Sequence, residues 1–214
     1  VNAQSEYEIW NDANTPVPNL RPALAITDPC APAKVVHRLL HLARYRNVQE
    51  LDNNDPLSPL AGKLVIELLG KAGSDYDPAD APRPQLFADP RNTMVRDGEW
   101  VFVRVRNTLP RSTDPERPWL NTLNITILDL APDWSIEQMY PSDPASDFIT
   151  LDGESETPPL PLHVSVPKGY KEITDIIKVF ATRGATSFRW LELPALDQPM
   201  QPKASHSTSC RGSA

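Results

Sequence analysis

Glycine, cysteine and long apolar runs are scarce in this chain of 214 residues, which holds 8 glycines and 2 cysteines. Two cysteines provide neither a disulfide framework nor a four-ligand zinc site. No apolar run approaches the roughly 20 residues that span a bilayer, and the start at Val1 shows no signal-peptide pattern. We therefore expect a soluble, cytoplasmic chain excised from a longer protein, with secretion left open and no membrane as a partner.

Basic residues are fewer than acidic ones, 21 against 28, which gives a formal net charge of -7. They form no cluster along the sequence. Nucleic-acid-binding modules usually present a basic face or stripe. The sequence also shows no glycine-rich phosphate loop, nucleophile elbow or dinucleotide fingerprint. We expect no nucleic-acid partner and no cofactor.

Proline, by contrast, is abundant: the chain has 24 prolines. Its hydrophobic content of 40% is ordinary for a globular protein. Prolines shorten helices and favour turns, edge strands and stiff loops. The length suits one globular domain. We expect a single domain over residues 1–200 and a polar C-terminal tail over residues 201–214.

One long helix is predicted, over about residues 33–51. Apolar residues recur there at helical spacing, as in a helix that packs one face on a core. They are Val36, Leu39, Leu40 and Ala43, extended by Val48 and Leu51. Pro32 suits the helix start, and the stretch NNDPLSP that follows is a stop signal.

Short strands separated by turns account for most of the remaining chain. In WVFVRVRN, Val101, Val103 and Val105 alternate with aromatic and basic residues, and Asp97-Gly98 marks a tight turn before them. In LNITILDL the apolar phase shifts to Leu128 and Leu130 near the end, which suggests a bulge or a twist. With no helices alternating between the strands, the pattern predicts an antiparallel β-sandwich of about seven or eight strands with one packed helix.

The tail contains SCRG, which echoes the Gln-Ala-Cys-[Arg/Gln/Gly]-Gly motif around the nucleophile of caspase-type peptidases. A catalytic cysteine of that type follows a buried strand and has a histidine within reach of its thiol. The residues before Cys210 are polar and form no such strand. We therefore assign no catalytic residue, and a disulfide between Cys30 and Cys210 stays open.

Two further clusters suggest binding chemistry, each with a simpler interpretation. His37 and His41 have the i, i+4 spacing of a zinc face, but Arg38 stands where zincins need glutamate, so we assign no metal. Asp129, Asp133 and Trp134 surround a turn and could form a carbohydrate or small-ligand site. The same spacing suits a plain β-turn, in which Asp133 bonds the local backbone and Trp134 packs.

Several sequence blocks look familiar together: HLARYRNVQELDNNDPLSPLAGKLVIELLG, DGEWVFVRVRN, LNITILDLAPDWSIEQMYPSD and TDIIKVFATRGATSFRWLELPALDQP. They resemble the non-catalytic C-terminal region that follows the peptidase domain in caspase-family (metacaspase or orthocaspase-like) proteins of fungi and bacteria. The resemblance runs from about Ser5 to Pro199. It implies a β-rich accessory domain beside a cysteine peptidase, with no catalytic residue of its own.

Exposed aromatic and arginine side chains are the usual anchors of protein interfaces. Trp119, Trp134, Arg189 and Trp190 are the candidates here, although core packing is the simpler role for a tryptophan. Our leading hypothesis is a non-enzymatic accessory or protein-interaction domain whose partner is a caspase-like peptidase domain or another protein. The alternative is a carbohydrate- or small-ligand-binding β-sandwich.

Overall fold

The computed structural model describes residues 1–53, 55–71, 85–87, 93–117, 119–167 and 170–198. Within these residues the chain forms one α-helix, one short 3-10 helix and eleven strands. The elements are β1 (Glu6–Tyr7), β2 (Leu24–Ala25), α1 (Ala31–Glu50), β3 (Leu64–Lys71), β4 (Gln85–Leu86), β5 (Trp100–Asn107), β6 (Leu123–Leu130), β7 (Ile136–Tyr140), β8 (Ile149–Leu151), β9 (Ser155–Glu156), β10 (Leu160–His163), β11 (Ile176–Thr182) and η1 (Arg189–Leu191).

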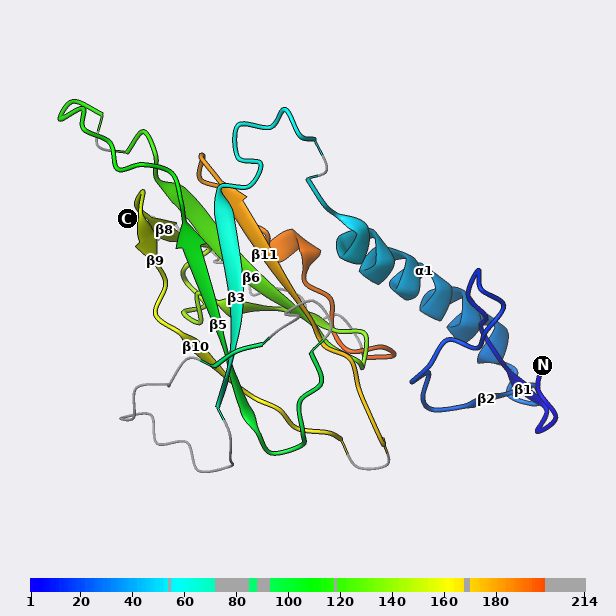
Figure 1. The fold of residues 1–214 in the computed structure, drawn as a ribbon. Coiled ribbons are helices and arrows are strands. Elements are labelled where there is room, and N and C mark those ends of the chain that lie inside the picture. Colours follow the sequence, from blue (N-terminus) through cyan, green and yellow to red (C-terminus); the bar gives the residue numbers. More distant parts are fainter. Residues whose placement is uncertain (54, 72–84, 88–92, 118, 168–169, 199–214) are drawn as a thin grey trace, which may run out of the picture.

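Two antiparallel sheets form a sandwich-like arrangement. The first has the strand order β10-β5-β3-β4, with β9 also paired to β5, and the second has the order β11-β6-β7, with β8 also paired to β6. A small third sheet joins β1 to β2 beside α1 (Figure 1). The class predicted from the sequence, mainly β with one helix near the N-terminus, is confirmed. The strand count exceeds the predicted seven or eight because four of the strands have only two residues.

The main core lies between the two large sheets. Aliphatic side chains of β5 meet those of β6, and β3, β10 and β11 add further residues at the margins. Its buried members are Val103, Val105, Leu109, Leu123, Ile125, Ile127 and Leu151. Alternate residues along each strand point to the same face, so the valines predicted to form one face of β5 do supply this core.

A second core lies on the opposite face of the sheet that contains β6. It joins Leu128, Leu130 and Ile136 to residues of α1 and of the segment around η1. The strand β6 is therefore buried on both faces, and the molecule has three layers: sheet, sheet and helix (Figure 1). The pairing of β6 with β7 shifts register between Ile127 and Leu128, where β7 has one extra residue, Met139. The irregularity predicted near Leu128 thus lies in β7, because β6 pairs with β11 without interruption. The shift of apolar phase in β6 reflects its burial on both faces.

The predicted bounds of α1 are close to the observed ones, but the orientation inferred from its apolar stripe is wrong. Val36, Leu39 and Leu40 are 57%, 48% and 62% exposed, and Ala43 is exposed as well. The buried residues are instead Ala31, Arg38, His41, Tyr45 and Val48. Only Val48, of the six residues assigned to the stripe, packs inward; Leu51 is exposed. In the described part of the chain no helix has the length and apolarity needed to cross a membrane.

Candidate functional site

The inner face of α1 is held to the sandwich by polar side chains as well as by packing. His41 donates from Nε2 to the carbonyl oxygen of Trp134 at 2.8 Å, and the Tyr45 hydroxyl donates to the carbonyl oxygen of Ala131 at 3.3 Å. The rings of Tyr45 and Trp134 pack edge to face with centroids 5.0 Å apart. Hydrogen bonds to backbone carbonyls let a histidine and a tyrosine be buried without leaving polar atoms unpaired.

Arg38 ties the same helix to two segments that are distant in sequence. Its side chain is 3% exposed and forms a salt bridge with Asp197, and one of its terminal nitrogens also donates to the carbonyl oxygen of Pro22 at 2.6 Å. A buried arginine needs such partners, because an unpaired charge in the interior is strongly unfavourable. Arg38 thus explains why a polar helix face points inward.

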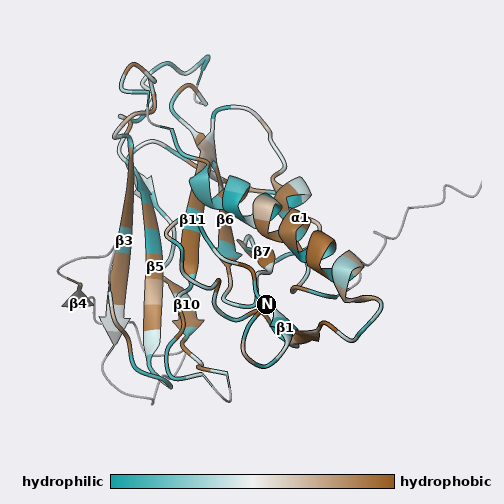
Figure 2. Cartoon of the chain, turned by 90° about the vertical axis from the view of Figure 1, so that its right-hand side faces the viewer, coloured by the Kyte–Doolittle hydropathy of each residue, from teal (hydrophilic) through white to brown (hydrophobic). Residues whose placement is uncertain are grey.

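The outer face of α1 consequently presents the aliphatic side chains to solvent. Val36, Leu39, Leu40 and Ala43 lie within two turns of one another on this face, which we call the outer α1 face. Figure 2 views the molecule from the α1 side and shows hydrophobic residues in bands along the helix. Exposed aliphatic residues are ordinary when single, whereas a contiguous set marks a site of interaction.

Two hollows lie along one edge of this face, between α1 on one side and the segments 22–24 and 193–198 on the other. The larger, of about 530 Å³, is lined by residues of α1 together with Leu24 and Asp197. The smaller, of about 90 Å³, is lined by Leu40 and Arg44 of α1 and by Leu193 and Pro194 opposite. His37 lines both hollows, so they adjoin at this residue.

Cys30 and His37 both line the larger hollow, which raises the question of a thiol–imidazole pair. Seven residues separate them along the helix start, which corresponds to roughly 10 Å of helix rise. Proton transfer needs hydrogen-bond reach, about 3 Å. The arrangement is therefore too wide for a catalytic dyad.

Asp133 and Trp134, two of the residues predicted to bind a ligand, serve the β6–β7 turn. Asp133 accepts hydrogen bonds from the backbone nitrogen and the hydroxyl of Ser135, at 3.0 and 2.7 Å. Trp134 adopts a φ of 69°, a left-handed conformation that bulky residues rarely take. Its ring packs on Tyr45, and its carbonyl receives His41. These contacts follow the simpler interpretation, a turn that holds α1.

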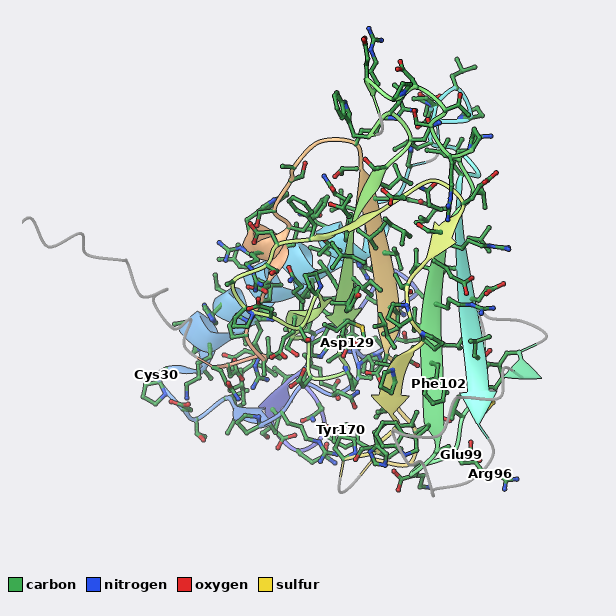
Figure 3. All side chains as sticks on the ribbon, turned by 90° about the vertical axis from the view of Figure 1, so that its left-hand side faces the viewer. Cys30, Arg96, Glu99, Phe102, Asp129 and Tyr170 are labelled. Atoms are coloured by element: carbon green, nitrogen blue, oxygen red, sulfur yellow. The ribbon has the colours of Figure 1, made fainter. Side chains whose placement is uncertain are left out.

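One carboxylate oxygen of Asp129, Oδ1, is buried without a hydrogen-bond partner among the described residues, as are Nε1 of Trp134 and Oε1 of Gln138. Burial, and then the charges of Asp175, Glu137 and Asp133, raise the pKa of Asp129 to about 6. The same environment raises the pKa of Tyr45, chiefly through burial. In Figure 3 Asp129 lies within the body of the molecule and Cys30 at its margin.

The other predicted anchors lie elsewhere. Trp119 precedes the first residue of β6 and Trp134 follows its last, so an eight-residue strand, roughly 25 Å long, separates them. Trp190 in η1 is 72% exposed and Trp119 is 64% exposed. The six residues predicted to bind thus fall into three places: Trp119 before β6, the group of Asp129, Asp133 and Trp134 at the β6–β7 turn, and the adjacent pair Arg189 and Trp190 in η1.

Arg189 has a structural task. Its guanidinium pairs with Asp147 at 3.0 Å and with Glu192 at 3.2 Å, and it donates to the carbonyl oxygens of Asp143 and Ser146. These contacts use its donors to fix the loop between β7 and β8. The side chain is 22% exposed, so it offers little to a partner.

The cysteine and histidine predictions stand as follows. Cys30 is an exposed free thiol, and Cys210 lies outside the described residues, so the bridge between them stays a prediction. Over the described ranges no group of three or more histidine, cysteine, aspartate or glutamate side chains is placed to hold a metal ion. His41 is committed to the Trp134 carbonyl, and His37 lies between the two hollows.

The outer α1 face and the hollows beside it were missed as a surface, although their residues were seen. One signal was available in the sequence: Arg38, His41, Tyr45 and Val48 also recur at helical spacing, on the side opposite to Val36. A helix with two such stripes has two faces suited to contacts. Comparison with family models, with curated proteins and with solved structures finds no match for this chain.

Proposed function

We propose that this chain is a non-enzymatic protein-interaction domain and that the outer α1 face is its binding surface. The observation that carries the proposal is the set of three adjacent aliphatic side chains, 48% to 62% exposed, on a helix that buries its polar side instead. Complete burial of one such side chain is worth about 1.5–3 kcal/mol. A partner that covers the half-exposed Val36, Leu39 and Leu40 therefore gains roughly 3 kcal/mol from these residues alone.

The helix is also held firmly enough to serve as a recognition element. His41, Tyr45 and Arg38 fix it at three successive turns, with contacts to the β6–β7 turn, to Pro22 and to Asp197. A pre-organised surface loses little conformational entropy on binding. An amphipathic partner segment or a flat apolar surface fits such a helix.

The partner implied by the sequence resemblance is a caspase-like cysteine peptidase domain. The blocks that carry this resemblance form the C-terminal half of α1, most of β3, all of β5, the β6–β7 hairpin, and the segment from β11 through η1. Of these, the β6–β7 turn and the segment after η1 contact α1 and orient it. In this proposal the chain is an accessory domain that binds the peptidase and regulates it.

The test mixes the chain with a caspase-like peptidase domain from the same organism and measures association by sedimentation and cleavage of a fluorogenic peptide. We expect association with the wild-type chain and its loss in the double variant Leu39→Glu/Leu40→Glu. Leu57→Glu is the matched control, since Leu57 is 88% exposed and lies outside α1. The regulatory proposal fails if the two proteins neither associate nor change the cleavage rate.

A further inference from the structure

The two hollows beside α1 have a regular lining on their helix side. Ala33, His37, Leu40 and Arg44 follow one another at i, i+4, i+7 and i+11, so they form one row along the helix. From the first of these residues to the last, the helix rises roughly 16 Å. That length accommodates about five residues of extended chain or eleven residues of helix.

The opposite side of the groove is also fixed in place. Leu193 exchanges two backbone hydrogen bonds with Ile136 of β7, at 2.9 and 3.0 Å, and the backbone nitrogen of Leu196 donates to the carbonyl oxygen of Asp133. Leu193 and Pro194 present apolar atoms to the smaller hollow, and Leu24 does so in the larger. We call this lined channel the α1 groove; it adjoins the outer α1 face, and Leu40 belongs to both.

The charge of α1 is opposite to that of the whole chain. The helix carries four cationic side chains, Lys34, Arg38, Arg44 and Arg46, and one anionic side chain, Glu50 at its last residue. The chain as a whole has a net charge of -7. Acidic residues thus dominate elsewhere. Lys34 and Asp197 line the larger hollow, and Arg44 lines the smaller one.

Arg44 is the one cationic side chain of α1 without an ion-pair partner among the described residues. Lys34 pairs with Asp28 at 3.0 Å and Arg46 pairs with Asp12 at 3.3 Å, while Arg38 is buried against Asp197. Arg44 is exposed, and no described residue forms an ion pair or hydrogen bond with its guanidinium. An arginine beside an apolar groove is suited to a bidentate contact with a carboxylate.

We propose that the α1 groove binds an acidic amphipathic segment of a partner protein, with aliphatic or aromatic side chains in the hollows and a carboxylate on Arg44. This inference rests on the proposed function, for which it names the chemistry of the partner. The apolar lining supplies Leu24, Leu40 and Leu193 for the hydrophobic side of the segment. Complementary charge sets its orientation and speeds its association.

Two occupants from this chain itself fit the groove less well. Residues 199–214 contain Lys203 and Arg211 and no aspartate or glutamate, so their charge has the same sign as that of Arg44. A second copy bound helix to helix about a two-fold axis would bring together two helices that each carry four cationic side chains and one anionic side chain. An acidic segment from another protein avoids both repulsions.

The experiment is a selection of random 12-residue peptides on the full chain, with a parallel selection on the double variant Leu40→Glu/Arg44→Glu. We expect peptides with net negative charge and at least two large apolar residues, enriched on the wild-type chain alone. For the most enriched peptide we expect Arg44→Glu to raise Kd at least tenfold and added salt to weaken binding. Arg183→Glu, a change of the same kind at an exposed arginine outside α1, should leave Kd within twofold.

Each contrary result overturns the groove proposal. These results are no peptide enriched over the double variant, enrichment of neutral or basic peptides, or an unchanged Kd in Arg44→Glu. Competition by a synthetic peptide of residues 199–214, or a wild-type dimer that Leu40→Glu dissociates in light scattering, identifies the occupant as this chain. As a control for folding, the midpoint temperature of thermal denaturation should be the same for Arg44→Glu as for the wild type.

Failure of the groove proposal is distinguishable from failure of the proposed function. If Leu39→Glu/Leu40→Glu abolishes binding of the peptidase domain while Arg44→Glu leaves it intact, the outer α1 face is an interface. The proposal that the α1 groove binds an acidic segment is then wrong. If acidic peptides bind in the groove but the peptidase domain does not associate, the partner is another protein.

Discussion

Substitution of Asp129 by asparagine should make the protein more stable at neutral pH. Burial and the neighbouring carboxylates raise the pKa of Asp129 from its ordinary value of 3.8 to about 6, and its Oδ1 is buried without a partner among the described residues. The folded state therefore disfavours the ionised form that predominates at pH 7. Asparagine keeps the shape of the side chain and removes that charge.

The magnitude follows from the size of the pKa shift. Each pKa unit corresponds to 1.36 kcal/mol, so a shift of about two units represents at most about 3 kcal/mol, and solvent at this half-buried site lowers it to roughly 2 kcal/mol. Because the pKa is raised in the folded state, the wild-type protein loses this stability as the pH rises from about 4 to about 6. Above pH 6 the loss is complete, and below pH 4 both states are protonated.

The assay is urea denaturation of the wild type and Asp129→Asn at pH 4, 5, 6 and 7. We expect nearly equal free energies of unfolding at pH 4 and an advantage of roughly 2 kcal/mol for the variant at pH 7. Asp12→Asn is the control, since the Asp12 side chain is 96% exposed and its pairing with Arg46 contributes little. A variant no more stable than wild type at pH 7, or a difference independent of pH, would refute the reasoning.

Three further substitutions probe the framework around the site. Arg38→Ala leaves Asp197 without its partner, and we expect a loss of about 3 kcal/mol in urea denaturation together with faster hydrogen exchange in α1. Gly153→Ala places a Cβ 2.6 Å from the carbonyl oxygen of Pro110, so we expect a lower denaturation temperature, equivalent to about 1–3 kcal/mol. Asn107→Ala removes a buried amide that donates to three backbone carbonyls at 2.8 to 3.1 Å, and we expect a loss of about 3 kcal/mol in urea denaturation.

Matched controls are available for these changes. Arg183→Ala removes an exposed arginine, and Gly184→Ala adds a Cβ that meets no atom within 4 Å. We expect changes within about 0.5 kcal/mol for both. A wild-type stability in Arg38→Ala would contradict the docking role assigned to that residue, and a harmless Gly153→Ala would contradict the close approach.

The strands were predictable because their signals are local. Alternation of Val101, Val103 and Val105 marks a strand with one buried face. The shift of apolar phase at Leu128 marks a strand that is buried on both faces. In β6 the apolar residues at odd positions, up to Ile127, pack against the other large sheet. Those at even positions, Leu128 and Leu130, pack against α1. Local periodicity suffices where the neighbours are other strands.

The orientation of α1 was not predictable from periodicity, because the contacts that decide it are distant in sequence. His41 and Tyr45 reach the carbonyls of Trp134 and Ala131, about 90 residues away. Arg38 reaches Asp197, which lies 159 residues away. Hydropathy ranks these side chains below leucine and valine, whereas their hydrogen bonds make them the better inner face.

The roles of the predicted site residues also depend on contacts that the sequence does not show. Arg189 has the composition of an interface anchor, yet its partners Asp147 and Glu192 occupy it. Trp134 is large enough for an interface anchor, yet its carbonyl oxygen and its ring contact His41 and Tyr45 of α1. The aliphatic stripe of α1 does not by itself tell an exposed face from a packed one; the second stripe, through Arg38, His41 and Tyr45, is the sequence signal for the observed orientation.

The most direct measurement maps the bound peptide on the protein by NMR, with the 15N-labelled chain titrated by the most enriched acidic peptide. The account predicts that the perturbed backbone amides lie in residues 31–44 and 193–198, which form the two sides of the α1 groove. It also predicts that amides of β3 and β10 stay unchanged. Perturbations centred on Trp119, or on the turn that holds Asp133, without change in α1 would contradict it.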